Sequence, residues 1–255
     1  MKSISSRDNP AYKKLLRLAG DARECRKQGR TLIDGPHLVA AYRAQLGLPE
    51  QLLVSESGAN HREIQDLIDA HAGSDVVLLK DPLFKALSGV DAPLGIAAVI
   101  RIPQETPAFT GGSCVLLDAI QDAGNAGSIL RSSAAAGIRD IFLGPGCAGA
   151  WSPRVLRAAQ GAHFRLRIRE SADLGQFLRD YRGKSLATVV GGGVSIYDIK
   201  LTGDIAWIFG NEGCGVSPVL AALASQLITI PLATDIESLN VAAAAAVCLF
   251  AIARN

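Results

Sequence analysis

Short apolar runs alternate with helix-forming segments along nearly the whole of this 255-residue chain. In the first part, TLIDG, QLLVSES, DVVLLK and LGIAAVIRI are predicted strands, while PHLVAAYRAQLG, REIQDLIDAHAG and PLFKALSG are predicted helices. Apolar strands that alternate with amphipathic helices are typical of a mainly parallel sheet covered on both faces. The chain is therefore predicted to be an α/β protein.

The alternation is interrupted once, at the stretch PQETPAFTGGS, whose Pro, Thr and Gly content favours a linker. It restarts with CVLLDAI and continues through RDIFLG, FRLRI, SLATVV, DIAWIFG and LITIPL to a long C-terminal helix. In the segment SPRVLRAAQGA, Ser152 is the expected N-cap of a helix. We therefore predict two α/β domains, at residues 1–102 and 114–255, joined by a linker at 103–113.

Positive charge is concentrated at the start of the chain. Residues 1–30 carry nine Lys and Arg against three acids, a net charge of +6, whereas the remaining residues sum to −4. A basic helix on a slightly acidic body favours a polyanionic partner, most simply nucleic acid, over a merely solvated surface. Aromatic residues make up only 5%, which argues against recognition through many stacked bases. Lys13, Lys14 and Arg17 are the candidate phosphate ligands.

Cysteine usage and hydropathy exclude several classes of protein. Five cysteines without a C-x-x-C pair predict neither a disulfide framework nor a zinc site, and no metal is expected. The start MKSISSRDNPAYKK lacks the apolar core of a signal peptide. The most apolar stretch, 241–253, is too short to span a bilayer, so no membrane partner is expected. These features predict a reduced, cytoplasmic protein.

One glycine pattern resembles a dinucleotide-binding fingerprint. Gly144, Gly146 and Gly149 follow the strand RDIFLG with G-x-G-x-x-G spacing. The next helix is predicted to begin only at Ser152, so the third glycine lies outside it. The acidic residue expected some twenty positions later is replaced by FRLRI. The pattern is interpreted as a turn.

Three other strand ends in the second half are polar or rich in glycine, and ligands of parallel sheets bind outside the carboxyl ends of strands. In DAIQDAGNAGSILR, a helix beginning near Asn125 places Arg131 one turn after Gly127, although a helix cap and an exposed charge would also explain these residues. In FGNEGCG, Glu212 lies in a bend whose glycines permit a close backbone approach, or only a turn. In IPLATDIESLN, Ser238 is explained as an N-cap, whereas the amide of Asn240 is harder to explain as structure.

Together these segments resemble the motifs of the SpoU/TrmH family, within the SPOUT superfamily of RNA methyltransferases. The matching residues are N-x-G-x-x-x-R at 125–131, G-N-E-G-x-G at 210–215, and I-P at 230–231 followed by S-L-N-V at 238–241. The resemblance covers 114–255 closely. It covers 1–102 through ISSRDNPAYKKLLRL and TLIDGPHLVAAY, which are similar to a substrate-binding domain of ribosomal-protein type. The chain departs from the family pattern at Ala123, Ala159 and Arg167.

The resemblance implies a SPOUT domain with a deep trefoil knot, a homodimer, and transfer of a methyl group from S-adenosylmethionine to a ribose 2′-hydroxyl of RNA. It implies that Arg131 activates the hydroxyl or holds the adjacent phosphate, because a guanidinium with a pKa above about 12 is a poor base. Asn125 would orient Arg131 or the ribose, and Glu212 would anchor Arg131 or a loop. Ser238 and Asn240 would contact the target nucleotide and the cofactor edge. Residues lining or adjoining the cofactor would be Thr188, Gly210, Asn211, Ile230, Leu232 and Leu239.

A second basic patch is expected in 152–170, where Arg154, Arg157, Arg165, Arg167 and Arg169 are opposed only by Glu170. Two alternatives to the enzymatic interpretation stay open. One is a non-catalytic RNA-binding protein that retains the knotted fold, and the other is a methyltransferase of the same superfamily that acts on a base. The sequence leaves open whether the RNA is ribosomal or transfer RNA.

Overall fold

A computed structural model describes residues 2–72, 75–103 and 106–252, and its chain forms two compact units. The first unit contains residues 1–105 and 151–164, and the second contains 106–150 and 165–255. Residues 151–164 therefore cluster with the first unit, although the predicted boundaries placed them in the second domain. The chain passes from one unit to the other three times, at 105/106, 150/151 and 164/165.

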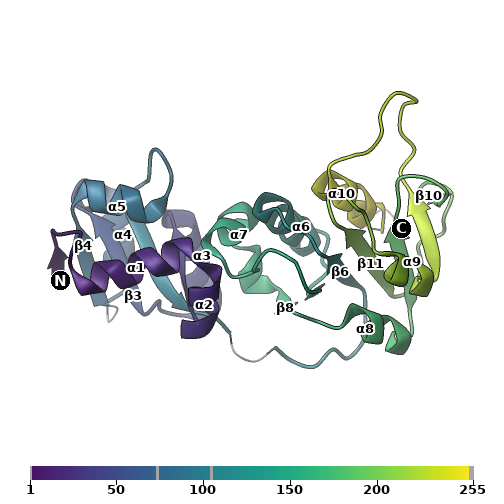
Figure 1. Ribbon diagram of the computed structural model, residues 1–255. Helices are drawn as coiled ribbons and strands as arrows, with labels where there is room; N and C mark the ends of the chain where they lie inside the picture. The colour runs from purple at the N-terminus through teal and green to yellow at the C-terminus, as the bar shows by residue number, and fades with distance from the viewer. Residues whose placement is uncertain (1, 73–74, 104–105, 253–255) are drawn as a thin grey trace. The chain divides into compact units, whose positions relative to one another are not determined.

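The first unit is built on a five-stranded sheet of order β1-β4-β3-β5-β2, whose strands are coloured from purple to blue in Figure 1. Only β5 runs antiparallel to its neighbours, β3 and β2. The elements are β1 (Lys2–Ile4), α1 (Pro10–Gly20), α2 (Ala22–Gln28), β2 (Arg30–Asp34), α3 (Pro36–Leu46), β3 (Gln51–Ser55), η1 (Gly58–Asn60), α4 (Arg62–Ala70), β4 (Asp75–Leu79), α5 (Asp81–Ser88), β5 (Ile96–Arg101), α7 (Pro153–Ala159) and, at the unit's edge, η2 (Ala162–Arg165).

The second unit is built on a seven-stranded sheet of order β10-β12-β9-β11-β6-β7-β8, in which every pairing is parallel. Its elements are β6 (Cys114–Asp118), α6 (Ala123–Ala135), β7 (Asp140–Leu143), β8 (Arg167–Arg169), α8 (Leu174–Asp180), β9 (Lys184–Thr188), β10 (Val194–Ser195), β11 (Ile205–Gly210), α9 (Pro218–Leu223), β12 (Gln226–Thr229) and α10 (Val241–Ile252). All six residues of the central strand β11 are buried, which explains its continuous apolar sequence.

The order of these strands determines where a ligand can bind. From β6 the chain adds β7 and β8 on one side, and it then crosses to add β9, β10, β11 and β12 on the other. A parallel sheet opens a crevice beyond the strand ends at such a reversal. Here the reversal lies between β6 and β11. In Figure 1, α10 lies beside β11, and it also packs against α6.

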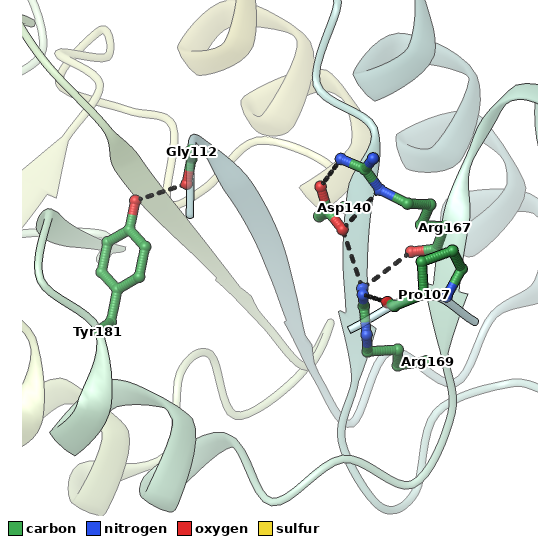
Figure 2. A network of polar contacts seen from close by, with 6 residues as sticks. All are labelled: Pro107, Gly112, Asp140, Arg167, Arg169 and Tyr181. Atoms are coloured by element: carbon green, nitrogen blue, oxygen red, sulfur yellow. Dashed lines mark hydrogen bonds and ion pairs between the residues drawn. The ribbon is translucent and has the colours of Figure 1, made fainter. Parts of the chain in front are cut away.

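The predicted linker at 103–113 includes residues 104–105, which lie outside the described residues. Residues 106–113 of this stretch belong to the second unit and pack on it, as Figure 2 shows in part. Arg169 donates to the carbonyl oxygen of Pro107, and the hydroxyl of Tyr181 donates to that of Gly112 over 3.0 Å. Phe109 packs edge-on against Phe142, with the ring centroids 5.5 Å apart. The segment after residue 105 is thus held by specific contacts.

The glycine pattern at 144–149 is a turn. β7 ends at Leu143 and α7 begins at Pro153, and none of the residues between them is helical. Ser152 caps α7 as predicted, because its hydroxyl accepts from the Val155 amide. None of the helices in the described ranges is long and apolar enough to cross a membrane.

Candidate active site

A cavity of about 550 Å³ lies in the second unit, among the segments that follow β9, β11 and β12 and the start of α10. This volume is within the range of about 300–1,000 Å³ typical of small-molecule sites. The structure brings together around it all six residues that the resemblance assigned to the cofactor: Thr188, Gly210, Asn211, Ile230, Leu232 and Leu239. Glu212, Ser238 and Asn240 line it as well.

The loop after β11 is shaped by the side chain of Asn211. Its amide donates to the Ala119 carbonyl oxygen over 2.8 Å, and its oxygen accepts from the backbone of Gly213 and Cys214. Gly210 has no room for a side chain, because a Cβ there would collide with the backbone of Gly215 and its successor. The sequence G-N-E-G-C-G therefore encodes a tight loop that presents backbone to the cavity.

Glu212 fastens this loop to the start of α6. Its carboxylate accepts from the backbone amides of Gln121 (3.2 Å) and Asp122 (3.1 Å) and from the side-chain amide of Asn125 (3.1 Å). Partial burial alone would raise the pKa of Glu212, but these hydrogen bonds outweigh it and lower that pKa. Of the two roles expected for Glu212, the contacts are those of a loop anchor. None of the described contacts joins it to Arg131.

Asn125 and Asn240 connect the first motif to the third. The amide of Asn240 donates to the side-chain oxygen of Asn125 over 2.9 Å. The oxygen of Asn240 accepts from the amides of Ala242 and Ala243, so Asn240 is the N-cap of α10. Asn240 thus has the structural explanation that the sequence did not reveal. Helix capping was the alternative explanation for Asn125 and Ser238, and neither has that role, since Asp122 caps α6 and Asn240 caps α10.

Two candidate catalytic residues, Ser238 and Arg131, are not part of this hydrogen-bond network. Ser238 is exposed at the cavity, and none of the hydrogen bonds among the described residues involves its hydroxyl. Arg131 is exposed on α6 but is not among the residues that line the cavity. No ion pair or hydrogen bond within the described ranges engages its guanidinium. The structure therefore does not bring Arg131 to the cavity within one chain.

The candidate RNA-binding residues fall into two groups. Lys13, Lys14 and Arg17 are exposed on α1, and Arg154 is exposed on α7. Arg157 is half-buried, and it donates to the Ser88 carbonyl oxygen over 2.6 Å and to Asp34 over 3.4 Å. Its guanidinium is therefore occupied within the first unit.

The second basic patch is also reduced by internal pairing. Asp140, at 4% side-chain exposure, binds both Arg167 and Arg169, as Figure 2 shows. Arg169 in addition lies 4.8 Å over the ring of Phe142. Within 152–170 only Glu170 opposes these arginines. Asp140 is distant from them in sequence and meets them through the pairing of β7 with β8, so its role could not be predicted.

Other functional residues escaped the sequence analysis. Asp122 is the cap of α6, and an Asp immediately before a helix was the available signal. Val189, Val190 and Cys214 line the cavity. For Val189 and Val190, the signal was the change from the apolar segment SLATVV to the glycines that follow it. For Cys214 the signal was its place inside the glycine loop.

No group of three or more His, Cys, Asp or Glu side chains within the described ranges is arranged to hold a metal ion. The donor set of the cavity instead suits an organic molecule. Apolar side chains of Ile230, Leu232 and Leu239 face glycine backbone and a few polar groups. Such a mixture of apolar walls with few polar groups is typical of cofactor pockets, and these residues fit an adenosyl group.

Comparison with known proteins relates the cavity to one family. Residues 112–250 match the model of the SpoU rRNA Methylase family. The chain is 33% identical over 253 residues to the 23S rRNA (guanosine(2553)-2′-O)-methyltransferase RlmP of Bacillus subtilis, which covers 98% of each chain. A solved RNA 2′-O ribose methyltransferase is similar at 27% identity with a TM-score of 0.84, covering 99% of this chain and 98% of that one. An AdoMet-bound rRNA methyltransferase of Sinorhizobium meliloti shares the fold, at 24% identity and a TM-score of 0.85, covering 99% and 97%.

Proposed function

The chain belongs to the SpoU rRNA methylase family, and we propose that it methylates a ribose 2′-hydroxyl of RNA in the cavity beside Gly210. S-adenosylmethionine is the methyl donor, and RNA is the substrate. The observation that supports this site is the convergence of the 210–215 loop and the 230–241 segment on one cavity, to which Asn125 of the first motif is joined through Glu212 and Asn240. The test is mass spectrometry of nuclease-digested RNA from cells that lack the protein. One 2′-O-methylated nucleoside should be missing, and an unchanged set of these nucleosides would contradict the proposal.

The donor, when bound, supplies a methyl group activated by a sulfonium charge, so the protein must position the ribose oxygen in line with it. Gly210, Ile230 and Leu239 would hold the donor through backbone and apolar contacts. Asn125 and Asn240 bond to each other, and Asn125 bonds to Glu212, so these residues keep the walls of the cavity in place. The hydroxyl of Ser238 is left to contact the target nucleotide.

Arg131 is the group that would stabilise negative charge on the ribose oxygen or hold the neighbouring phosphate. It cannot serve as an ordinary base, because its pKa is above about 12. Arg131 does not line the cavity of its own chain. Either bound RNA or a second copy of the chain must therefore bring Arg131 and the reacting oxygen together. We infer the second copy.

A homodimer is supported by the outer face of α10. Ala243, Val247 and Phe250 follow one another at helical spacing and are exposed, with side chains that are all apolar. An apolar face of this kind on a helix is normally covered. α10 packs against α6, the helix that carries Arg131. A second copy on this face would therefore lie close to Arg131.

Val247→Asp tests the dimer. We expect light scattering to give the mass of one chain, and we expect methyl transfer to be lost while S-adenosylmethionine still binds, because the cavity residues belong to one chain. Gln65→Asp on α4 is the control for an added charge at an exposed position. A monomeric wild-type protein with full activity would contradict this part of the proposal.

Ribosomal RNA is the proposed substrate class, because the Bacillus subtilis relative, matched along its length, is named for 23S rRNA. Since ribosomal RNA of bacteria is made in the cytoplasm, we propose that compartment as the place of action. The exposed cations of α1 would bind RNA phosphates as part of an RNA-binding first domain of ribosomal-protein type.

The deep trefoil knot remains part of the proposal. Its support is that segments after β9, β11 and β12 line one cavity with the start of α10, and a crystal structure would trace it directly.

A further inference from the structure

A second cavity, in the first unit, combines an apolar floor with a cationic rim. We call it the basic cavity, and its volume is about 620 Å³. Leu15, Leu18 and Val99 form part of its lining and are otherwise buried. Its charged lining residues are Lys14, Arg30, Arg101 and Glu50, which together carry a net charge of +2.

Two cations of this rim lie close together, although like charges repel each other. Arg30 and Arg101 are directly opposite each other on the antiparallel strands β2 and β5. Like charges at such positions repel each other. Glu50 lies between them, with one oxygen 2.5 Å from Nε of Arg30 and the other 2.5 Å from Nε of Arg101.

Glu50 therefore holds two guanidinium groups in fixed orientations. Hydrogen bonding from Arg30, together with that from Arg101, keeps the pKa of Glu50 below its ordinary value, so the carboxylate is charged at neutral pH. One carboxylate does not use all the donors of two guanidinium groups, each of which has five N–H groups. Arg101 in particular has 77% of its side chain exposed, and Arg30 has 46%.

We propose that the basic cavity binds an unpaired nucleotide of the RNA substrate, with its base over the apolar floor and its adjoining phosphates at Arg30, Arg101 and Lys14. This inference rests on the proposed function, which makes RNA the polyanion that the chain binds. Unpaired bases are recognised by stacking on aromatic rings or on guanidinium planes. The volume lies within the range of about 300–1,000 Å³ that small ligands occupy. The site is separate from the cavity beside Gly210, because all its residues belong to the first unit.

The test measures binding of two fluorescein-labelled probes, single-stranded oligouridine and an RNA duplex, to the full chain. Arg101→Gln should weaken oligouridine binding roughly tenfold, as expected for loss of a charged hydrogen bond. It should also reduce the slope of log K against log salt by about 0.7. Arg30→Gln should act similarly. The control is Lys2→Gln, which removes another exposed, ion-paired cation of the same unit outside the cavity.

Three outcomes of these binding measurements would overturn the proposal. One is a loss on Arg101→Gln no greater than that on Lys2→Gln. A second is an equal loss for the duplex, which would indicate backbone contact without an unpaired base. If an oligoglutamate competes as well as the oligouridine, the surface is a general anion site and the proposal fails. Thermal unfolding of each variant checks the fold.

A wild-type measurement keeps the test independent of any folding defect. RNA that contains 4-thiouridine should cross-link on irradiation to peptides that include residues 11–18, 49–51 or 99–101. Cross-links confined to other peptides would contradict the proposal. In parallel, methyl transfer by the wild type to RNA from cells lacking the protein tests the proposed function separately. If transfer occurs while Arg101→Gln keeps the wild-type KM and oligouridine affinity, only the basic cavity is refuted.

Discussion

The side-chain amide of Asn125 is occupied at both ends, since it donates to Glu212 and accepts from Asn240. A residue engaged in this way positions others. The sequence identified all three residues as candidates, but it could not predict their contacts, because Asn125 is 87 positions from Glu212 and 115 from Asn240 in the chain. Arg131 and Ser238 are the residues proposed to contact the RNA, since their polar groups are exposed and are not used by this network.

Arg131→Ala should reduce the rate of methyl transfer by a factor on the order of 10²–10³, the usual effect of losing one well-placed donor to a developing oxyanion. The affinity for S-adenosylmethionine should change little, because Arg131 does not line the cavity. Arg131→Lys should restore part of the rate, since an ammonium lacks the planar fork of a guanidinium. Single-turnover transfer of labelled methyl at saturating enzyme is the measurement. A near wild-type rate for Arg131→Ala would show that Arg131 only binds RNA.

The lowered pKa of Glu212 gives a pH-dependent stability. Its carboxylate is favoured in the folded state, so its contribution is fully present above the ordinary pKa of 4.5 and is lost as the pH falls through the lower folded-state pKa. Glu212→Gln should therefore be less stable than the wild type above pH 4.5, and the difference should shrink on further acidification. Urea unfolding at several pH values measures this difference. A gap that stayed constant at acid pH would contradict the assignment.

Among the elements, strands were predictable wherever burial left an apolar run, as in β3, β5, β6 and β11. β1 and β10 were missed, because each is short and lies at the edge of a sheet, held by pairing with β4 or β12. The helix predicted in the basic segment is present as α1, and a second helix follows it, because Asp21 ends α1 and its side chain caps α2. FRLRI was predicted as a strand, yet only Arg167–Arg169 pairs, since a 3-10 turn includes Phe164 and Arg165.

The helix α1 is expected to bind phosphate through its exposed face. Its apolar residues Tyr12, Leu15 and Leu18 are buried, which leaves Lys13, Lys14 and Arg17 exposed. Replacing these three cations by Gln should weaken RNA binding and reduce the salt slope by about 2 to 3 in total. The affinity for S-adenosylmethionine should not change. A matched triple replacement of Lys2, Lys80 and Lys85, exposed lysines of the same unit, is the control, and an equal effect from it would indicate a solvated surface.

At the scale of the molecule, the membership of residues 151–164 depended on contacts that no local pattern encodes. Thr31 donates to the Trp151 carbonyl oxygen over 2.7 Å, and the rings of Tyr42 and Phe164 meet edge-on at 5.4 Å. The composition of 103–113 indicated a linker. Residues 151–164, in contrast, lie inside a regular alternation of strands and helices, although they belong to the first unit. From the sequence alone, α7 is therefore assigned to the second domain, to which its neighbours along the chain belong.

Hydrogen exchange in mild denaturant tests this membership. The amides of α7 should exchange together with those of β2 and β5, because α7 packs on the first unit. Exchange that instead follows β6 and β7 would contradict it. A measurement with S-adenosylmethionine added sharpens the comparison, since the ligand should slow exchange more in the second unit, which contains its cavity.

The three passages of the chain between the units have a consequence for how such a protein can be cut or recombined. A protease that nicks the backbone near residue 105 cuts the one covalent link to residues 1–105, but residues 151–164 of the other fragment still pack with them in the first unit. The nicked protein should therefore run as one species on a native gel and as two on a denaturing gel. For the same reason, a chimaera that exchanges only residues 1–105 with those of a relative would pair a foreign sheet with the host's α7. A functional graft would have to transplant both segments together, which makes the first unit a poor module for exchange by a single recombination event.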